Sequence, residues 1–305
     1  MNKEKELLER YNIKPRKIGY RNKTKIIETD QGKYTLKVKK APNLDIYRYL
    51  DNHNFQNYLS QINDPKDPYE IYNYIEEETI DKETKAIDLI YTLSLLHNKT
   101  TTYQDVNLDT IKSDYESLNN KIDYLFSYYY DLQDYIENKV YMSPSEYLLI
   151  RNINLIYISL TNAKRHLEEW YQIKQKQKQE RQVFLHNDLS LSHFLKRDAG
   201  YLINWKKSHQ GSPIYDFISL YQNEYENLEM ESLFSIYQSK YKYTKDERLL
   251  FNTIIELPWK LSFKDNNYIN TINVEHLLDY LSKTNQFISK EYEKDQKAQQ
   301  EKLDQ

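Results

Sequence analysis

The sequence predicts an α+β protein with two lobes, in which a small β-rich lobe precedes a large helical lobe. Residues 16–80 are rich in alternating, β-forming runs. Residues 82–182 carry apolar positions at helical spacing, and residues 183–205 return to short β-like runs. Because alternation with period two indicates strands and spacing of three or four residues indicates helices, the order of these patterns predicts the two lobes. The 305 residues suffice for both lobes and a core between them.

The predicted boundaries divide the chain into three parts. The β-rich lobe covers residues 1–78, and the helical lobe covers residues 79–290 and includes a hairpin at 183–205. A polar tail follows at 291–305. Since the tail has almost no apolar residues, we expect it to fray or to be disordered.

The first lobe begins with a predicted β-hairpin. The segment "TKIIETDQGKYTLKVKK" at 24–40 contains two β-rich runs joined by a turn at "DQG". The second run divides into two faces by alternation, one with Tyr34, Leu36 and Val38 and the other with Thr35, Lys37 and Lys39. Residues 43–55 then predict a short helix, and residues 69–78 predict a strand that ends in an acidic connector.

Two long helices are expected in the second lobe. The first covers "KETKAIDLIYTLSLLHNKT" at 82–100. The second begins at Ser143, a good N-cap residue, with Pro144 at the first helical position and Glu146 completing a capping box. Its core-facing stripe recurs in steps of three and four residues: Leu149, Ile153, Ile156, Leu160, Ala163, Leu167 and Trp170.

Composition excludes several classes of function. The net charge of −3 and the pI of about 6.2 provide no basic excess for nucleic-acid binding. The absence of cysteine excludes disulfides and thiolate metal sites. No window approaches the roughly 20 apolar residues of a membrane span, and the charged N-terminus lacks the apolar core of a signal peptide, so we expect cytoplasmic synthesis. The 31 tyrosines fit a bias toward AT-rich codons better than a functional use.

The segment "VFLHNDLSLSHFL" at 183–195 carries the candidate chemistry. It has the spacing H-x-D-L-x-x-x-N of a kinase catalytic loop, with His186 and Asp188 in place and His193 where a metal-binding Asn belongs. The loop therefore predicts either a phosphotransferase or a protein that has lost part of a phosphotransferase site.

Three consecutive segments, "LHNDLSLSHFL", "YLINW" and "GSPIYDF", resemble the aminoglycoside phosphotransferase and choline kinase superfamily. Its usual pattern is "HGDLxxxNxL", then "xxIDW", then "GxPxxDL". Within that superfamily the segments are most similar to the kinase-like spore coat proteins of endospore-forming bacteria, of the YsxE and CotS type. The resemblance covers residues 183–217 and implies a bilobal, protein-kinase-like fold with the hairpin at the cleft between the lobes.

The resemblance also implies roles for individual residues. Asp188 takes the place of the catalytic base, His186 would brace the loop, and Asp216 would tie the loop in place as a structural residue. Lys37 matches the lysine that contacts nucleotide phosphates, with Asp45 as its helix partner. Lys37 is equally well explained as a solvated strand lysine, and Lys39 and Lys40 are alternative candidates for the phosphate contact.

The magnesium site departs from the family pattern. Its two usual ligands are an Asn and an Asp, and here His193 and Asn204 replace them. Because magnesium prefers oxygen ligands, and anionic ones above all, these positions are predicted to be degenerate and non-functional. Lys206 and Lys207 follow and favour bound anions over a cation. A zinc site at His186, Asp188 and His193 is the weaker alternative, since the loop already explains the first two.

The sequence thus predicts a catalytically impaired, kinase-like protein that acts as a scaffold or binding component of the spore coat. We expect spore coat proteins as partners, no nucleic acid, and no bound cofactor. An active phosphotransferase on a small hydroxylated, aminoglycoside-like or choline-like substrate is the alternative, and it would require ATP and magnesium. A nucleotide- or anion-binding module without catalysis is the third hypothesis.

Overall fold

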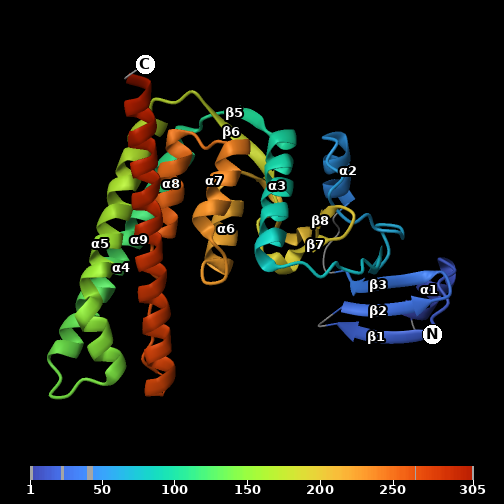
Figure 1. The fold of residues 1–305 in the computed structure, drawn as a ribbon, viewed down its shortest axis with the longest axis horizontal. Coiled ribbons are helices and arrows are strands. Elements are labelled where there is room, and N and C mark those ends of the chain that lie inside the picture. Colours follow the sequence, from blue (N-terminus) through green and yellow to red (C-terminus); the bar gives the residue numbers. More distant parts are fainter. Residues whose placement is uncertain (1–2, 22–23, 40–43, 265, 304–305) are drawn as a thin grey trace.

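The computed structural model describes residues 3–21, 24–39, 44–264 and 266–303. Its helices and strands form the two lobes that the sequence predicts, with a small antiparallel sheet at one end of the molecule and long helices at the other (Figure 1). The predicted α+β, bilobal fold class is therefore confirmed.

The N-terminal lobe is a four-stranded antiparallel sheet with a short helix packed against it. Its elements are α1 (Lys3–Arg10), β1 (Lys17–Arg21), β2 (Thr24–Thr29), β3 (Gly32–Val38) and β4 (Tyr69–Asn73). Leu36 of β3 is 3% exposed and packs in a small core with Ile27 and Leu7, whereas Lys37 points to the opposite face. Gly32 at the β2–β3 turn has a φ of +143°, a conformation that side chains rarely adopt. The predicted turn and face alternation therefore agree with the structure.

The segment from α2 (Leu44–Asn52) to Tyr58 connects the two lobes. Leu50 and Phe55 are fully buried in the large core of the helical lobe rather than in the core under the sheet. Tyr58 forms a parallel bridge with Leu202, and the Asn57 amide donates a hydrogen bond of 2.8 Å to the Gly200 carbonyl oxygen. The short helix therefore belongs, by its packing, to the second lobe.

The C-terminal lobe is mostly helical. Its helices are α3 (Lys82–Thr100), α4 (Leu108–Glu137), α5 (Pro144–Lys174), α6 (Ile214–Glu224), α7 (Met230–Lys240), α8 (Lys245–Ile255) and α9 (Asn267–Leu303). The α5 helix begins as predicted, because Ser143 and Glu146 form a reciprocal capping box. Every residue of the predicted core-facing stripe of α5 is at most 6% exposed. None of the described helices combines the length and the apolarity needed to cross a membrane.

Short strands carry the candidate loop. They are β5 (Thr102–Asp105), β6 (Gln179–Leu185), β7 (Phe194–Lys196), β8 (Gly200–Leu202) and β9 (His209–Gly211). The predicted hairpin is formed by β7 and β8, whereas β6 pairs with β5 and β9 in a separate sheet. A Cβ atom at Gly200 would lie 2.4 Å from the Phe194 ring, so the hairpin requires glycine there.

The polar tail differs from the expectation of fraying. The α9 helix continues to Leu303, and Glu291 is 8% exposed. Glu291 accepts a hydrogen bond of 3.2 Å from Arg248, and the Tyr292 hydroxyl lies 2.9 Å from His166 Nε2. These contacts with α8 and α5 hold the start of the polar segment against the lobe.

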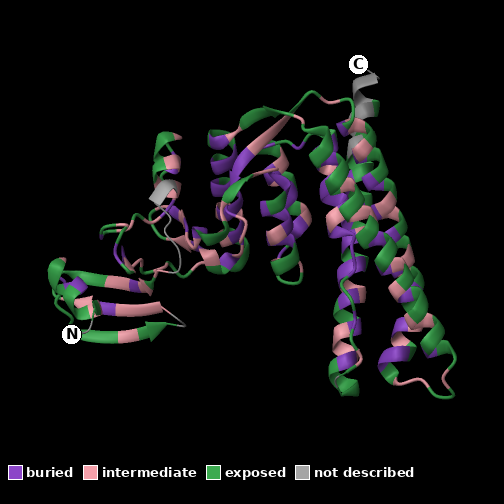
Figure 2. Cartoon of the chain, turned by 180° about the vertical axis from the view of Figure 1, so that it is seen from behind, coloured by how far each residue is buried: buried purple, intermediate pink, exposed green. Residues whose placement is uncertain are grey.

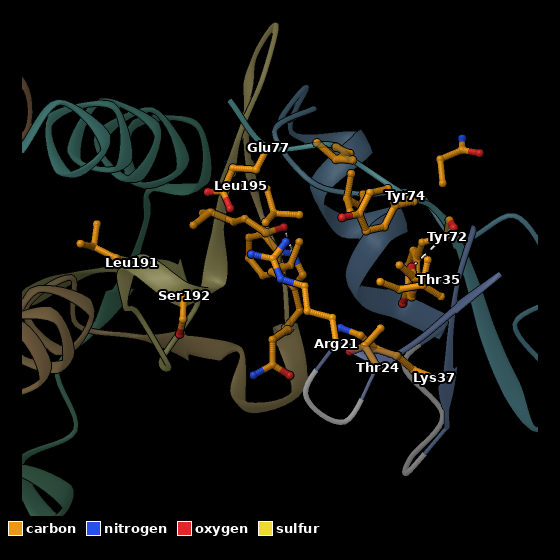
Figure 3. Close-up of a pocket in the computed structure, with 18 of the residues that line it drawn as sticks. Arg21, Thr24, Thr35, Lys37, Tyr72, Tyr74, Glu77, Leu191, Ser192 and Leu195 are labelled. Carbon is orange, nitrogen blue, oxygen red and sulfur yellow. Dashed lines mark hydrogen bonds between the residues drawn. The ribbon is translucent and has the colours of Figure 1, made fainter. Parts of the chain in front are cut away.

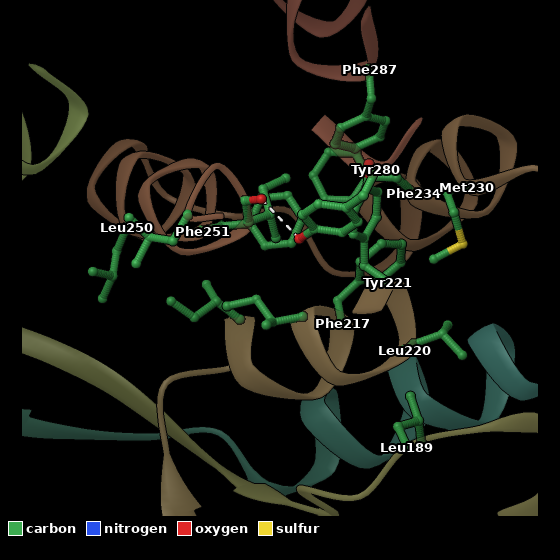
Figure 4. Close-up of a cluster of buried hydrophobic side chains, with 14 of the residues drawn as sticks. Leu189, Phe217, Leu220, Tyr221, Met230, Phe234, Leu250, Phe251, Tyr280 and Phe287 are labelled. Carbon is green, nitrogen blue, oxygen red and sulfur yellow. Dashed lines mark hydrogen bonds between the residues drawn. The ribbon is translucent and has the colours of Figure 1, made fainter. Parts of the chain in front are cut away.

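An aromatic cluster forms the core between α6, α7, α8 and α9 (Figure 4). The Phe234 ring stacks on Phe251 at 5.3 Å and meets Phe217 at 5.1 Å between ring centroids. Leu189 of the candidate loop is fully buried in this core. Buried positions follow the inner faces of these helices (Figure 2). Leu189 therefore anchors the loop in the hydrophobic core of the helical lobe.

Candidate functional site

Asp216, in the first turn of α6, holds the start of the candidate loop. Its carboxylate is fully buried and accepts hydrogen bonds from the backbone N–H groups of His186, at 2.9 Å, and Asn187, at 2.5 Å. Asn187 has a φ of +56°, the left-handed conformation that asparagine tolerates better than most residues. The two backbone hydrogen bonds fix the turn that places Asp188 at the surface of the loop.

His97, near the C-terminal end of α3, is hydrogen-bonded to the Asp216 carboxylate. Its Nε2 lies 3.0 Å from Asp216 Oδ2, and its Nδ1 lies 2.7 Å from the Tyr237 hydroxyl. Burial by itself would raise the pKa of Asp216, but the hydrogen bond and the charge of His97 hold that pKa below its ordinary value. No local sequence pattern links His97 to Asp216, a residue 119 positions away.

His186 braces the loop against the connection between β8 and the short helix η2 (Trp205–Lys207). Its Nε2 lies 2.7 Å from the Ile203 carbonyl oxygen, so this nitrogen carries the proton and donates it. Its Nδ1 is buried without a hydrogen-bond partner among the described residues. Burial lowers the pKa of His186, with Asp216 opposing that effect. The imidazole is therefore held in its neutral form.

The depressed pKa of His186 predicts a loss of stability in mild acid. The unfolded chain takes up the proton at the ordinary histidine pKa, about 6.5, and the folded chain only at lower pH. The contribution of neutral His186 to the free energy of unfolding is therefore complete above about pH 6.5. It decreases as the pH falls through that value toward the folded pKa. We expect His186→Gln to reduce the difference in melting temperature between pH 8 and pH 5.5. An unchanged difference would contradict the assignment, and His276→Gln, on the surface of α9, is the control.

Asp188 is held by two donors. Asn204 Nδ2 lies 3.0 Å from Oδ2, and Lys207 Nζ lies 2.8 Å from Oδ1. Burial tends to raise the pKa of Asp188, but the hydrogen bond and the charge of Lys207 hold that pKa below its ordinary value. Asp188 is therefore a carboxylate with both oxygens engaged.

His193 and Asn204 complete a closed network with Asp188. His193 Nδ1 donates to the Asp188 backbone carbonyl oxygen at 2.6 Å, which leaves Nε2 as an acceptor for Asn204 Nδ2 at 3.1 Å. Because a carboxylate only accepts hydrogen bonds, Asn204 must turn its NH₂ group toward Asp188 and not its oxygen. Asn204 itself adopts the left-handed conformation, with a φ of +71°.

These residues do not fit a magnesium ion. The two predicted ligand positions, His193 and Asn204, present an imidazole nitrogen and an amide NH₂ group to the site, whereas magnesium requires oxygen ligands in near-octahedral geometry. Among the described residues, no group of three or more His, Asp and Glu side chains could hold a metal ion. His186 directs its Nε2 to Ile203 instead of joining Asp188 and His193.

A cavity of about 580 Å³ separates the lobes beside this network. Thr35, Lys37 and Tyr72 reach it from the sheet, and Leu191, Ser192 and Leu195 reach it from the loop and β7 (Figure 3). Its apolar lining comes from both lobes: Ile26, Leu59, Ile75, Ile80, Leu195, Leu202 and Ile203. Its size is typical of small-molecule sites.

Lys37 lines this cavity in cross-strand register with Glu70 of β4. Burial lowers its pKa, the nearby Lys206 lowers it further, and Glu70 opposes both effects. Of the alternative lysines, Lys39 donates to the Pro65 carbonyl oxygen, and Lys40 lies outside the described residues. The backbone of Asp45 belongs to α2, but its side chain also lies outside the described residues.

Comparison with known proteins identifies the fold. Neither a protein-family model nor a curated protein matches this chain. An aminoglycoside phosphotransferase from Alicyclobacillus acidocaldarius has a similar structure, with a TM-score of 0.72, 10% identity and 95% of each chain covered. The AMP-bound complex of a spectinomycin phosphotransferase also matches, with a TM-score of 0.52, 12% identity and 94% of each chain covered. The chain therefore shares the bilobal, kinase-like fold of these aminoglycoside phosphotransferases.

Proposed function

We propose that this protein is a catalytically impaired relative of the phosphotransferases that acts as a scaffold or binding component. One observation carries the proposal: the Asn204 amide donates hydrogen bonds to both Asp188 and His193. The positions that would bind a cation are thereby joined to one another and to the residue in the place of the base.

The contacts of Asp188 argue against efficient phosphoryl transfer. The reaction depends on positioning and on neutralising the charge of the transferred group, which the metal ions normally provide. A base must also offer an oxygen to the substrate hydroxyl. Here Lys207 and Asn204 each donate to one oxygen of Asp188, so a substrate hydroxyl would compete with them. These contacts support the proposal that phosphoryl transfer is impaired.

The proposed biological setting is the spore coat. It rests on the resemblance of residues 183–217 to kinase-like spore coat proteins, with coat proteins as the partners and deposition on the spore after synthesis in the cytoplasm. In a scaffold, the fold matters and the catalytic position does not. This distinction separates the proposal from the enzyme alternative.

A pair of assays tests the proposal. The purified protein, with ATP, magnesium and a panel of aminoglycosides, choline and sugars, is expected to transfer no phosphate above the level of Asp188→Asn. In a spore-forming host, Asp188→Ala is expected to leave coat assembly and protein abundance unchanged. Turnover that disappears in Asp188→Asn, or a coat defect of Asp188→Ala at normal abundance, would replace the scaffold with the enzyme.

The active enzyme is the second candidate, and one observation favours it. Asp188 remains a carboxylate at the surface of the loop, with its side chain 22% exposed, and Lys37 lines the adjoining cavity. A substrate hydroxyl that displaced Lys207 would then reach the base. The expected substrate is a small hydroxylated, aminoglycoside-like or choline-like molecule, and the same turnover assay decides between the candidates.

A further inference from the structure

The cavity between the lobes carries more positive than negative charge. Its lining contains the cationic side chains of Arg21, Lys37, Lys82, Lys85 and Lys206 and the acidic side chains of Glu70, Glu77 and Glu78. Lys85 is paired with Glu77, so a surplus of positive charge remains among the other lining residues. The protein as a whole has a net charge of −3, and the local sign is therefore opposite to the global one.

Lys37 and Lys206 face this cavity from different lobes. Lys37 lies on β3, and Lys206 lies in the short helix η2 (Trp205–Lys207), two residues after Asn204. Because both side chains line the same cavity, their ammonium charges oppose each other there. The lowered pKa of Lys37, caused first by burial and then by the charge of Lys206, agrees with this placement. Two like charges at one cavity are a cost that a bound anion would remove.

Lys206 also lies close in the chain to a predicted metal-ligand position. It follows Asn204, one of the two replaced ligand positions, and the adjacent Lys207 already neutralises Asp188. An ammonium group is a compact cation that binds phosphate as a point charge. The chain therefore places its own cations beside a site that does not suit magnesium.

The cavity also offers apolar surface for a group attached to the anion. Ile26 and Thr35 of the sheet and Leu195 and Leu202 of the hairpin belong to its lining. Near the sheet, the Tyr47 and Tyr72 hydroxyls are hydrogen-bonded to each other at 3.2 Å. A volume of about 580 Å³ accommodates a ligand of nucleotide size.

We infer that this cavity binds a phosphate-bearing, nucleotide-type ligand without a divalent cation, with Lys37 and Lys206 replacing the metal at the phosphates. The inference rests on the proposed function, because it requires the closed Asp188–His193–Asn204 network. The inference goes beyond the proposed function because it assigns a class of ligand and predicts that magnesium weakens the binding of that ligand. Free ATP offers more negative charge to the lysines than its magnesium complex does, so magnesium weakens binding.

The test is calorimetric titration of the full chain with ATP, adenosine and tripolyphosphate, each in EDTA and in excess magnesium. We expect ATP to bind in EDTA, to bind more weakly in magnesium, and to bind more tightly than adenosine. Lys206→Gln is expected to raise the Kd for ATP by about tenfold, the loss of one charge-assisted contact. Lys206→Arg should restore most of the affinity. Lys164→Gln, which breaks a surface pair with Asp123, is the matched control and should leave the Kd unchanged.

Each other outcome overturns the inference in a recognisable way. No ATP binding in either buffer, together with no turnover, removes the inference and leaves the impaired scaffold standing. ATP binding that requires magnesium but produces no turnover also removes the inference and leaves the impaired scaffold standing. Binding that requires magnesium and is accompanied by phosphoryl transfer removes both. Equal affinity for adenosine and ATP, unaffected by Lys206→Gln, shows that the lysines do not hold phosphate.

Discussion

Replacing Asp216 by alanine is expected to lower the free energy of unfolding by about 3–5 kcal/mol, the range for removing one partner from a buried charged network. The carboxylate is fully buried and accepts from two backbone N–H groups and from His97. Alanine would leave these three donors buried without an acceptor, and each such loss costs about 1–3 kcal/mol. The loop that carries Asp188 should lose its fixed conformation together with the stability.

Urea denaturation measures this effect. The matched control is Asp123→Ala, which removes a carboxylate that is 49% exposed and should change stability by less than about 0.5 kcal/mol. The pH dependence provides a second check. Because the folded pKa of Asp216 is depressed, its contribution is complete above the unfolded pKa of about 4 and is lost as the pH falls through the folded pKa. A loss below about 1 kcal/mol at neutral pH would show that Asp216 does not hold the loop.

The double substitution His193→Asn and Asn204→Asp is expected to create magnesium-dependent ATP binding, with a gain of about tenfold or more in affinity when magnesium is added. It replaces an imidazole nitrogen with an amide oxygen and adds a carboxylate next to Asp188. Asn204 Nδ2 now lies 3.0 Å from Asp188 Oδ2, so the new carboxylate would face an existing one at short range. Without a metal ion the two charges repel, and a divalent cation relieves the repulsion.

Titration with ATP in EDTA and in magnesium measures this gain, and melting temperatures without ATP report binding of the ion itself. The double variant should melt below the wild type in EDTA and should recover in magnesium, whereas the wild type should not respond to the ion. Asn120→Asp, on the exposed face of α4, adds the same charge away from the site and is the control. A double variant that ignores magnesium would mean that more than these two positions separates the chain from a metal-binding phosphotransferase.

The sequence alone determined the features that depend on local periodicity. Alternation along β3 separated buried Leu36 from Lys37 at the cavity, and the start of α5 followed from the capping box at Ser143. The motif spacing located the loop, and the resemblance of residues 183–217 implied the kinase-like fold. These features were predictable because a strand, a helix cap or a turn depends on residues that are neighbours in the chain.

Only the tertiary structure decided which distant groups meet. His97 and Asp216 are 119 residues apart, and no periodic pattern relates them. The packing of α2 with the helical lobe, the pairing of β6 with β5 and β9, and the docking of the tail through Glu291 were equally absent from the local pattern. The sequence showed that Asn204 stands where a metal-binding Asp is expected. The direction of its amide group, however, follows from its neighbours in the fold. Asp188 and His193 both accept hydrogen bonds there, so the NH₂ group must face them, and only the folded chain brings those acceptors to it.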